Sequence, residues 1–216
     1  MIWSPAELQE TSVAQLDQTI VIASSPLLVG GGLVIAVILV AAIAAVSLYN
    51  TLVRVRQTCM ESWSDIDTEL QRRHDLVPNL VSTVEGYAAH EKSVLEQVTR
   101  LRARAVDARK EDAETRAGIE EMLQGSIGTL IATAEAYPDL KANRSFLDLQ
   151  QELADTETRV ARSRRFYNDN VREFRAATLT FPSNLVAAGF GFRSSDFEFF
   201  EASPGDRDPV DTSGLG

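Results

Sequence analysis

The longest apolar stretch of the chain lies near its N-terminus. No charged side chain occurs between residues 18 and 53, and residues 27–48 within that interval are almost wholly apolar. A helix of this length rises about 33 Å, which exceeds the roughly 30 Å of a bilayer's hydrocarbon core. Ser25 as N-cap and Pro26 in the first helical position indicate where it begins. The pattern therefore predicts one membrane-spanning helix over residues 26–50, after a short N-terminal segment at residues 1–25.

The flanks of this stretch indicate an anchor rather than a cleaved signal. A secretory signal begins with a basic region and has a shorter apolar core, whereas residues 1–17 contain acidic side chains and no Lys or Arg. Arg54 and Arg56 follow the apolar stretch, so the positive-inside rule places the C-terminal domain in the cytoplasm and the N-terminus outside. Gly32 and Ala36 have small-xxx-small spacing, which either supports self-association or reflects ordinary Gly and Ala usage in such helices.

After Thr51 the apolar positions recur at three- and four-residue steps, which is typical of a helix with one buried face. Pro78 lies inside this pattern and predicts a bend near Asp75, and Gly86-Tyr87 predicts a break. Further helices are predicted over residues 90–106, 113–136, 146–181 and 185–190. The fold class is all-α: the transmembrane helix continues into an antiparallel bundle of about four helices (51–192), with a short C-terminal helix. Residues 193–216 are expected to form an acidic, mostly disordered tail.

Composition disfavours several functions. The formal net charge of −10 disfavours nucleic-acid binding, because an acidic domain repels phosphate backbones. A single cysteine, Cys59, excludes an intrachain disulfide, and two histidines provide little material for a metal site. Ser62, Ser64, Ser82 and Thr83 have no evident base beside them, and no glycine-rich loop matches a phosphate cradle. We therefore predict no catalytic, cofactor-binding or metal-binding residue.

The polar residues of interest lie on the predicted helix seams. Arg73 belongs to a charged turn, Arg72–Asp75. It could pair with Asp67 or Glu69 on its own helix, but we favour ion pairs between helices. The alternatives for this turn are binding of anionic lipid headgroups or of a partner's carboxylate. We predict a structural polar network inside the bundle, and a surface that binds a partner is the rival interpretation. The network comprises Arg73, Asn79, Glu157, Arg164, Tyr167 and Asn168.

Several motifs of the chain resemble those of one family. They are Tyr49-Asn50-x-Leu52-Val53-x-x-Arg56, Trp63-x-x-Ile66-Asp67-x-x-Leu70-x-Arg72-Arg73-x-Asp75-Leu76-x-Pro78-Asn79-Leu80-Val81, Gly86-Tyr87-x-x-His90-Glu91, Ala134-Glu135-x-Tyr137-Pro138-x-Leu140-Lys141-Ala142-Asn143-x-x-Phe146-x-x-Leu149-Gln150, Leu153-x-x-Thr156-Glu157, Arg164-x-x-Tyr167-Asn168 and Phe181-Pro182. In this order, over about residues 46–201, the chain resembles the LemA family of membrane-anchored helical proteins. It differs in its longer N-terminal segment, its acidic tail and Phe174-Arg175, where relatives usually have Tyr-Asn.

The resemblance implies one transmembrane helix carrying a helical bundle, and it brings no assigned reaction. A related protein acts in magnetosome membrane formation, and family members are often encoded beside a membrane-bound zinc protease. We expect a non-enzymatic, membrane-anchored scaffold or adaptor that presents its cytoplasmic bundle to an unidentified membrane-associated protein. The alternative is an accessory or regulatory partner of a membrane protease or envelope-stress system, and an enzyme of unknown type is a remote third. The expected partners are the lipid bilayer, that protein and a second copy of the chain.

The predicted topology can be tested with a tag at the C-terminus. In sealed right-side-out vesicles the tag should survive added protease and be cleaved once detergent opens the membrane. Cleavage in intact vesicles would reverse the assignment.

Overall fold

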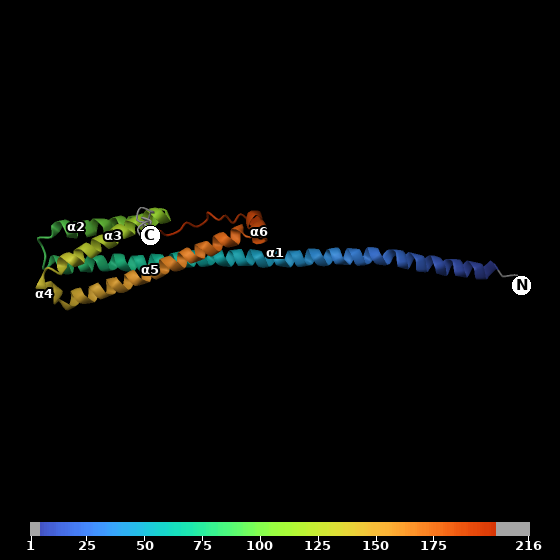
Figure 1. Ribbon diagram of the computed structural model, residues 1–216, viewed down its shortest axis with the longest axis horizontal. Coiled ribbons are helices and arrows are strands. Elements are labelled where there is room, and N and C mark those ends of the chain that lie inside the picture. Colours follow the sequence, from blue (N-terminus) through green and yellow to red (C-terminus); the bar gives the residue numbers. More distant parts are fainter. Residues whose placement is uncertain (1–4, 202–216) are drawn as a thin grey trace, which may run out of the picture. The chain divides into compact units, whose positions relative to one another are not determined.

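A computed structural model of the protein describes the backbone of residues 5–201 and the side chains of residues 30–201. No strand occurs in this described part, in agreement with the predicted all-α class. The elements, shown in Figure 1, are α1 (Pro5–Glu85), α2 (Lys92–Asp107), a 3-10 turn η1 (Ala108–Lys110), α3 (Ala113–Ala134), α4 (Pro138–Lys141), α5 (Arg144–Leu179) and α6 (Ser183–Phe190).

The chain divides into two compact units, one ending at Thr51 and the other beginning at Leu52. In the first unit, the described part of α1 is long and apolar enough to cross a membrane, with a mean hydropathy of 2.7 and no buried side chain in its most apolar window. Leu33 and Ile43, for example, are 65% and 70% exposed. Exposed side chains of this kind suit a helix surrounded by lipid.

α1 begins earlier than predicted. It starts at Pro5, so the helix start assigned to Ser25 and Pro26 is wrong. A proline inside a helix removes one backbone donor, but the residues before Pro26 include Ala, Gln and Leu, which favour helix. The apolar stretch and the first helix of the second unit therefore belong to one helix, as predicted.

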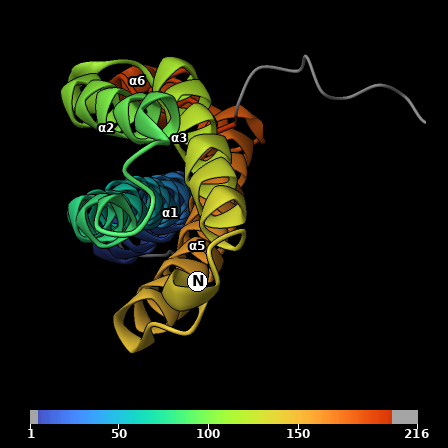
Figure 2. The same ribbon diagram turned by 90° about the vertical axis from the view of Figure 1, so that its left-hand side faces the viewer.

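The second unit is an antiparallel bundle of the 52–85 part of α1 with α2, α3 and α5 (Figures 1 and 2). α1 ends at Glu85, immediately before the predicted break at Gly86-Tyr87. Side-chain caps fix the starts of α3 and α5: Asp112 accepts a hydrogen bond from Thr115 N (2.8 Å), and Asn143 accepts one from Phe146 N (3.2 Å). Each cap satisfies a backbone donor that the first helical turn leaves unpaired.

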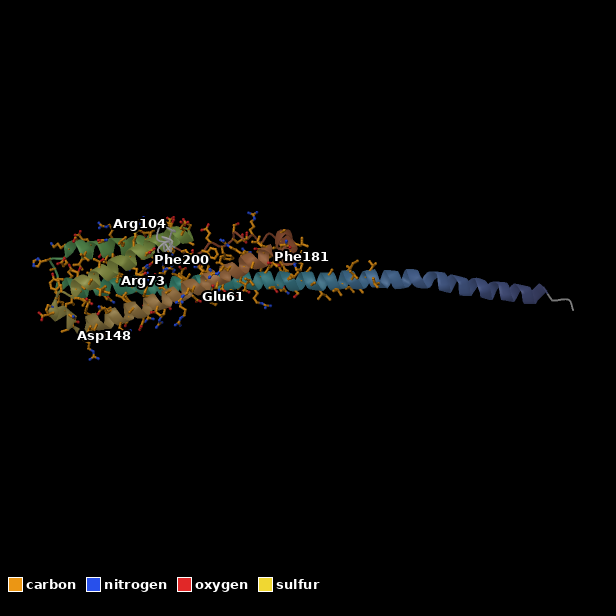
Figure 3. All side chains as sticks on the ribbon, viewed as in Figure 1. Glu61, Arg73, Arg104, Asp148, Phe181 and Phe200 are labelled. Atoms are coloured by element: carbon orange, nitrogen blue, oxygen red, sulfur yellow. The ribbon has the colours of Figure 1, made fainter. Side chains whose placement is uncertain are left out.

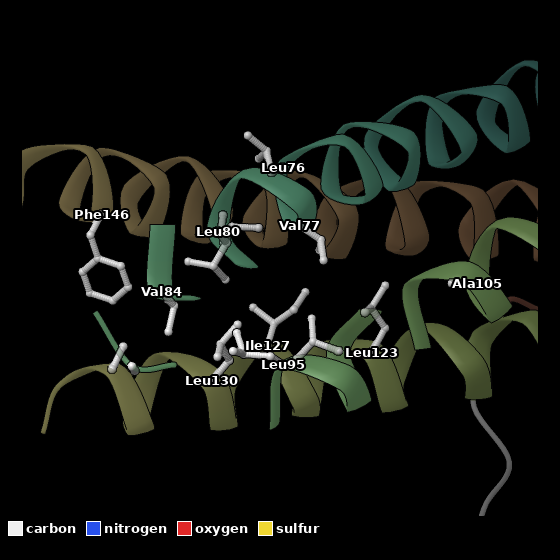
Figure 4. Close-up of a cluster of buried hydrophobic side chains, with 14 of the residues drawn as sticks. Leu76, Val77, Leu80, Val84, Leu95, Ala105, Leu123, Ile127, Leu130 and Phe146 are labelled. Atoms are coloured by element: carbon white, nitrogen blue, oxygen red, sulfur yellow. The ribbon is translucent and has the colours of Figure 1, made fainter. Parts of the chain in front are cut away.

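Two hydrophobic clusters fill the bundle. The first lies at the end where α1 meets α2, shown in Figure 4, and includes Val77, Leu80, Val84, Leu95, Leu123, Ile127, Leu130 and Phe146. The second surrounds the beginning of the unit and includes Leu52, Cys59, Ile66, Leu70, Val160, Tyr167, Val171, Phe174, Ala187 and Phe200. Met122 of α3 is 45% exposed, whereas its neighbours on that helix, Leu123 and Ile127, reach the core.

α1 continues through Pro78, whose ring nitrogen cannot donate to the carbonyl of His74 one turn earlier. Arg102 of α2 supplies the missing donor, because its Nε donates to His74 O at 3.1 Å. A bond between helices thus replaces the one that the proline removes. The bend near Asp75 stays a prediction.

The segment after α6 lies along α5. Gly191 adopts a left-handed conformation (φ 78°), and Phe192 N donates to Ala187 O, which is the pattern of a glycine-terminated helix. Residues 193–201, predicted to begin the disordered tail, are ordered: Asn168 accepts from Phe200 N (2.9 Å) and donates to Phe200 O (3.4 Å). Aromatic burial of Phe200 offsets the entropy of ordering this strap. The rest of the predicted tail, residues 202–216, lies outside the described residues.

The thiol of Cys59 is fully buried and should therefore be unreactive in the folded protein. Burial, followed by the nearby Glu173 carboxylate, raises the pKa of its thiol to about 11. The thiolate is the reactive species, so folded Cys59 should resist alkylation by iodoacetamide at pH 8 and react after denaturation, as measured by mass spectrometry. Because the pKa is raised on folding, the associated stability is complete below about pH 9 and is lost as the pH rises through about 11.

The matched control is Met60→Cys in a Cys59→Ala background, since Met60 is the next residue of α1 and is 52% exposed. This cysteine should be alkylated rapidly in the folded protein. Equal rates at the two positions would contradict the burial of Cys59.

Candidate functional site

A layer of charged side chains separates the two hydrophobic clusters. Arg73, on α1, is only 3% exposed and lies midway along the bundle (Figure 3). Its guanidinium donates to Glu120 of α3 at 3.3 Å and to Glu157 of α5 at 2.5 Å. The next residue, His74, is fully buried, and its Nε2 lies 2.8 Å from the other Glu120 oxygen. A carboxylate only accepts, so His74 Nε2 donates in this contact.

A second guanidinium lies one helical turn before Glu120. Arg116 is 1% exposed, forms an ion pair with Asp67 of α1 and stacks over the Trp63 ring at 5.3 Å from its centre. Trp63 in turn contacts the rings of Tyr167 (5.2 Å) and Phe200 (5.7 Å). A planar guanidinium combines these two contacts well, since its N–H groups point at a carboxylate in its plane while an aromatic ring packs on its face.

The layer has the properties of a structural ion-pair network. Two guanidinium groups face three carboxylates within a bundle whose clusters on both sides are apolar. Cys59 is held as a thiol by its raised pKa, and burial raises the pKa of Tyr167 to about 12, so neither provides an anionic nucleophile near neutral pH. Among residues 30–201, no three His, Cys, Asp or Glu side chains are grouped so that they could hold a metal ion.

The charged layer opens onto a cleft between α3 and α5. Its volume is about 680 Å³, within the range of pockets that bind ligands or peptide side chains. Arg73 and Glu157 lie at one end, and the remaining lining is apolar or amide-bearing: Gln124, Ile127, Gly128, Ile131, Leu147, Gln150, Gln151, Leu153 and Ala154. A side chain at Gly128 would meet no atom within 4 Å at its Cβ, so this glycine contributes open space.

The six residues predicted to form one network fall into three places. Arg73 and Glu157 meet at the charged layer. Tyr167 and Asn168 hold the strap, because Tyr167 OH donates to Glu198 O at 2.8 Å and Asn168 pairs with the Phe200 backbone. Arg164 stacks over the Phe200 ring at 5.7 Å. Asn79 is exposed and lies apart from both groups.

Glu120 and Arg116 were not predicted from the sequence, and His74 was assigned only to the charged turn Arg72–Asp75. Arg116 and Glu120 are four residues apart on the face of α3 that also carries Leu123 and Ile127, and charged residues in such core-facing positions are the signal that would have found them. The possible pairing of Arg73 with Asp67 or Glu69 is not formed. Arg73 instead forms the ion pairs between helices that the sequence favoured, with Glu120 of α3 and Glu157 of α5, and Asp67 pairs with Arg116.

The Phe174-Arg175 pair of α5 also contacts the strap. Phe174 is fully buried and meets the Phe197 ring edge-on at 5.1 Å. Arg175 donates to Phe197 O at 2.9 Å and stacks on the Phe199 ring at 4.3 Å. Both side chains therefore pack against the aromatic segment that follows α6.

The sequence of this chain is similar to those of several known proteins. A profile described as LemA family matches residues 62–213. The chain is 26% identical over 231 residues to Magnetosome protein MamQ 2 of Paramagnetospirillum magneticum, covering 93% of this chain and 84% of the relative. It is 25% identical to Magnetosome protein MamQ of Magnetospirillum gryphiswaldense, covering 91% and 83%. It is 27% identical to Protein LemA of Metamycoplasma hominis, covering 77% and 74%.

The charged layer predicts a large loss of stability for Arg73→Met. This change leaves the buried Glu120 carboxylate without its guanidinium partner, and breaking a buried pair in this way costs about 3–5 kcal/mol. The free energy of unfolding can be measured for the full chain in detergent by denaturant titration of the circular dichroism signal.

The adjacent Arg72→Met is the matched control, since Arg72 is exposed and should change stability by no more than about 0.5 kcal/mol. Combining Arg73→Met with Glu120→Gln removes both charges and should restore part of the loss. Equal changes in the free energy of unfolding for Arg73→Met and Arg72→Met would contradict a stabilising role for the ion pairs of Arg73.

Proposed function

Because the chain belongs to the LemA family, we propose that it is a membrane-anchored scaffold whose bundle binds another membrane-associated protein through the cleft between α3 and α5. The apolar part of α1 fixes the protein to the bilayer. The bundle, on the cytoplasmic side, presents the cleft to proteins of the same membrane.

The cleft is the observation that carries this proposal. Apolar side chains such as Ile131 and Leu147 line it beside the amides of Gln124, Gln150 and Gln151. This combination suits a protein segment, whose apolar side chains enter the cleft while its polar groups pair with the amides at the edge. Leu147 is 48% exposed although large and apolar, which leaves an area that a partner can cover.

The charged layer supports binding rather than catalysis. The charges of Arg73 and Glu157 neutralise each other at the end of the cleft. The thiol of Cys59 and the phenol of Tyr167 both have raised pKa values. A network that joins three helices would keep α3 and α5 at a fixed separation, and a rigid groove binds at a lower entropic cost than one that must be ordered. The names of the relatives, which are magnetosome and LemA proteins, are not enzyme names.

Gly128→Leu tests the proposal by filling the cleft. A leucine at this position meets no atom at its Cβ and is a better helix former than glycine by about 1 kcal/mol, so the fold should be kept or stabilised. In cells, a photocrosslinker placed at Gln150 of the full chain should form a discrete adduct with one protein, and Gly128→Leu should abolish it.

Gly125→Leu is the matched control. Gly125 lies on the same helix with equally open space at its Cβ, but outside the cleft lining, so the adduct should persist. An adduct that both variants leave unchanged, or no adduct at all at Gln150, would contradict binding through the cleft.

A further inference from the structure

α6 and the residues around it expose an unusual amount of apolar surface. Leu179, Phe181, Leu185 and Phe190 are between 65% and 74% exposed, although each is large and apolar. The other side of α6 is buried, because Ala187 and Val186 belong to the second hydrophobic cluster. The helix is therefore held to the bundle by one face while its other face and its two ends present apolar side chains outward.

The same segment carries no charge. From Ala176 to Phe192 there is no acidic or basic side chain, and arginines, Arg175 and Arg193, stand directly before and after this run. Exposed segments in contact with water usually contain charged residues, whereas segments that lie in a membrane interface combine apolar and aromatic side chains with basic flanks.

Chain connectivity places α6 beside the membrane boundary. The buried residue of α6, Ala187, belongs to the same hydrophobic cluster as Leu52. Phe192, just after α6, stacks with Arg56 at 5.9 Å. The apolar stretch of α1 ends at Leu48 in the sequence, so Leu52 is about 6 Å further along the helix. The headgroup region on each side of a bilayer is about 5–8 Å thick, so Leu52 lies at headgroup depth.

We propose that α6 and the preceding Leu179–Phe181 corner form a second membrane contact, in which Phe181, Leu185 and Phe190 enter the headgroup–acyl boundary of the bilayer that the anchor spans. Phenylalanine and leucine transfer favourably to this boundary. Arg54 and Arg193, both exposed, lie at the same end of the bundle and can pair with anionic headgroups. The contact would fix the bundle at its base by two attachments, α1 and α6, instead of one.

A bilayer fits this surface better than a second copy of the chain. The exposed apolar side chains are grouped at the end of the bundle that leads directly to the anchor, where lipid is present in every membrane-bound copy. Acidic residues near this end, such as Glu173 and Glu198, are exposed on α5 and the strap and lie outside the uncharged run. They can stay in water while Phe181, Leu185 and Phe190 enter the interface.

Site-directed spin labelling of the full chain tests the proposal. Leu185→Cys and Phe181→Cys are labelled separately with a nitroxide and reconstituted in vesicles of phosphatidylcholine with a minor fraction of phosphatidylglycerol. The control is Asp139→Cys in α4, which is exposed at the opposite end of the bundle. Wild-type protein treated in parallel reports any labelling of the buried Cys59, and circular dichroism checks that each variant is folded.

Oxygen concentrates in lipid, whereas a nickel chelate stays in water, so relaxation of the label by each reagent reports its surroundings. The ratio of oxygen to nickel accessibility should be severalfold higher at Leu185 and Phe181 than at Asp139. Equal ratios at the three positions would overturn the proposal, because α6 would then lie in water. Low accessibility to both reagents at Leu185 would also overturn it, since the label would then be covered by protein, such as a second copy.

Discussion

The guanidinium of Arg73 is bound by carboxylates from two other helices, Glu120 of α3 and Glu157 of α5. An isolated buried charge is very costly, so the sequence tolerates Arg73 at this position only in an arrangement that brings both carboxylates within reach. Apolar seams alone permit helices to slide by a turn with little change in buried area. The ion pairs do not, and the two hydrophobic clusters on either side are therefore held at defined levels of the bundle.

Most of the fold could be predicted from local patterns. The period of apolar positions predicted the helices, and Gly86-Tyr87 predicted where the first of them ends, because these features act within a few residues. The start at Pro26 failed for a related reason: a proline permits a helix to begin there but does not require it, and α1 begins at Pro5. Order in residues 193–201 was also missed, since it depends on Asn168 and Trp63, which are distant in sequence.

The polar site was harder to predict than the fold. Arg73 and Glu157 could be selected because they lie near helix seams, but their common partner, Glu120, belongs to a helix whose position relative to α1 is not encoded in any local pattern. Periodicity assigns a residue to a face and leaves open which helix that face meets. For this reason Tyr167 and Asn168 were grouped with Arg73, whereas the structure joins them to the strap. The cleft between α3 and α5 was equally hard to predict from the sequence, because side chains from three helices line it.

The bond from Arg102 to the His74 carbonyl has a consequence for how α2 is aligned. In an uninterrupted helix each interior carbonyl already accepts one backbone hydrogen bond, so none of them lacks a donor. Pro78 leaves the His74 carbonyl without its backbone donor at a single level of α1, and Arg102 lies at the matching level of α2 and donates to it. The hydrogen bond to this carbonyl therefore fixes the level at which α2 lies along α1. It does so independently of which apolar side chains fill the space between the two helices.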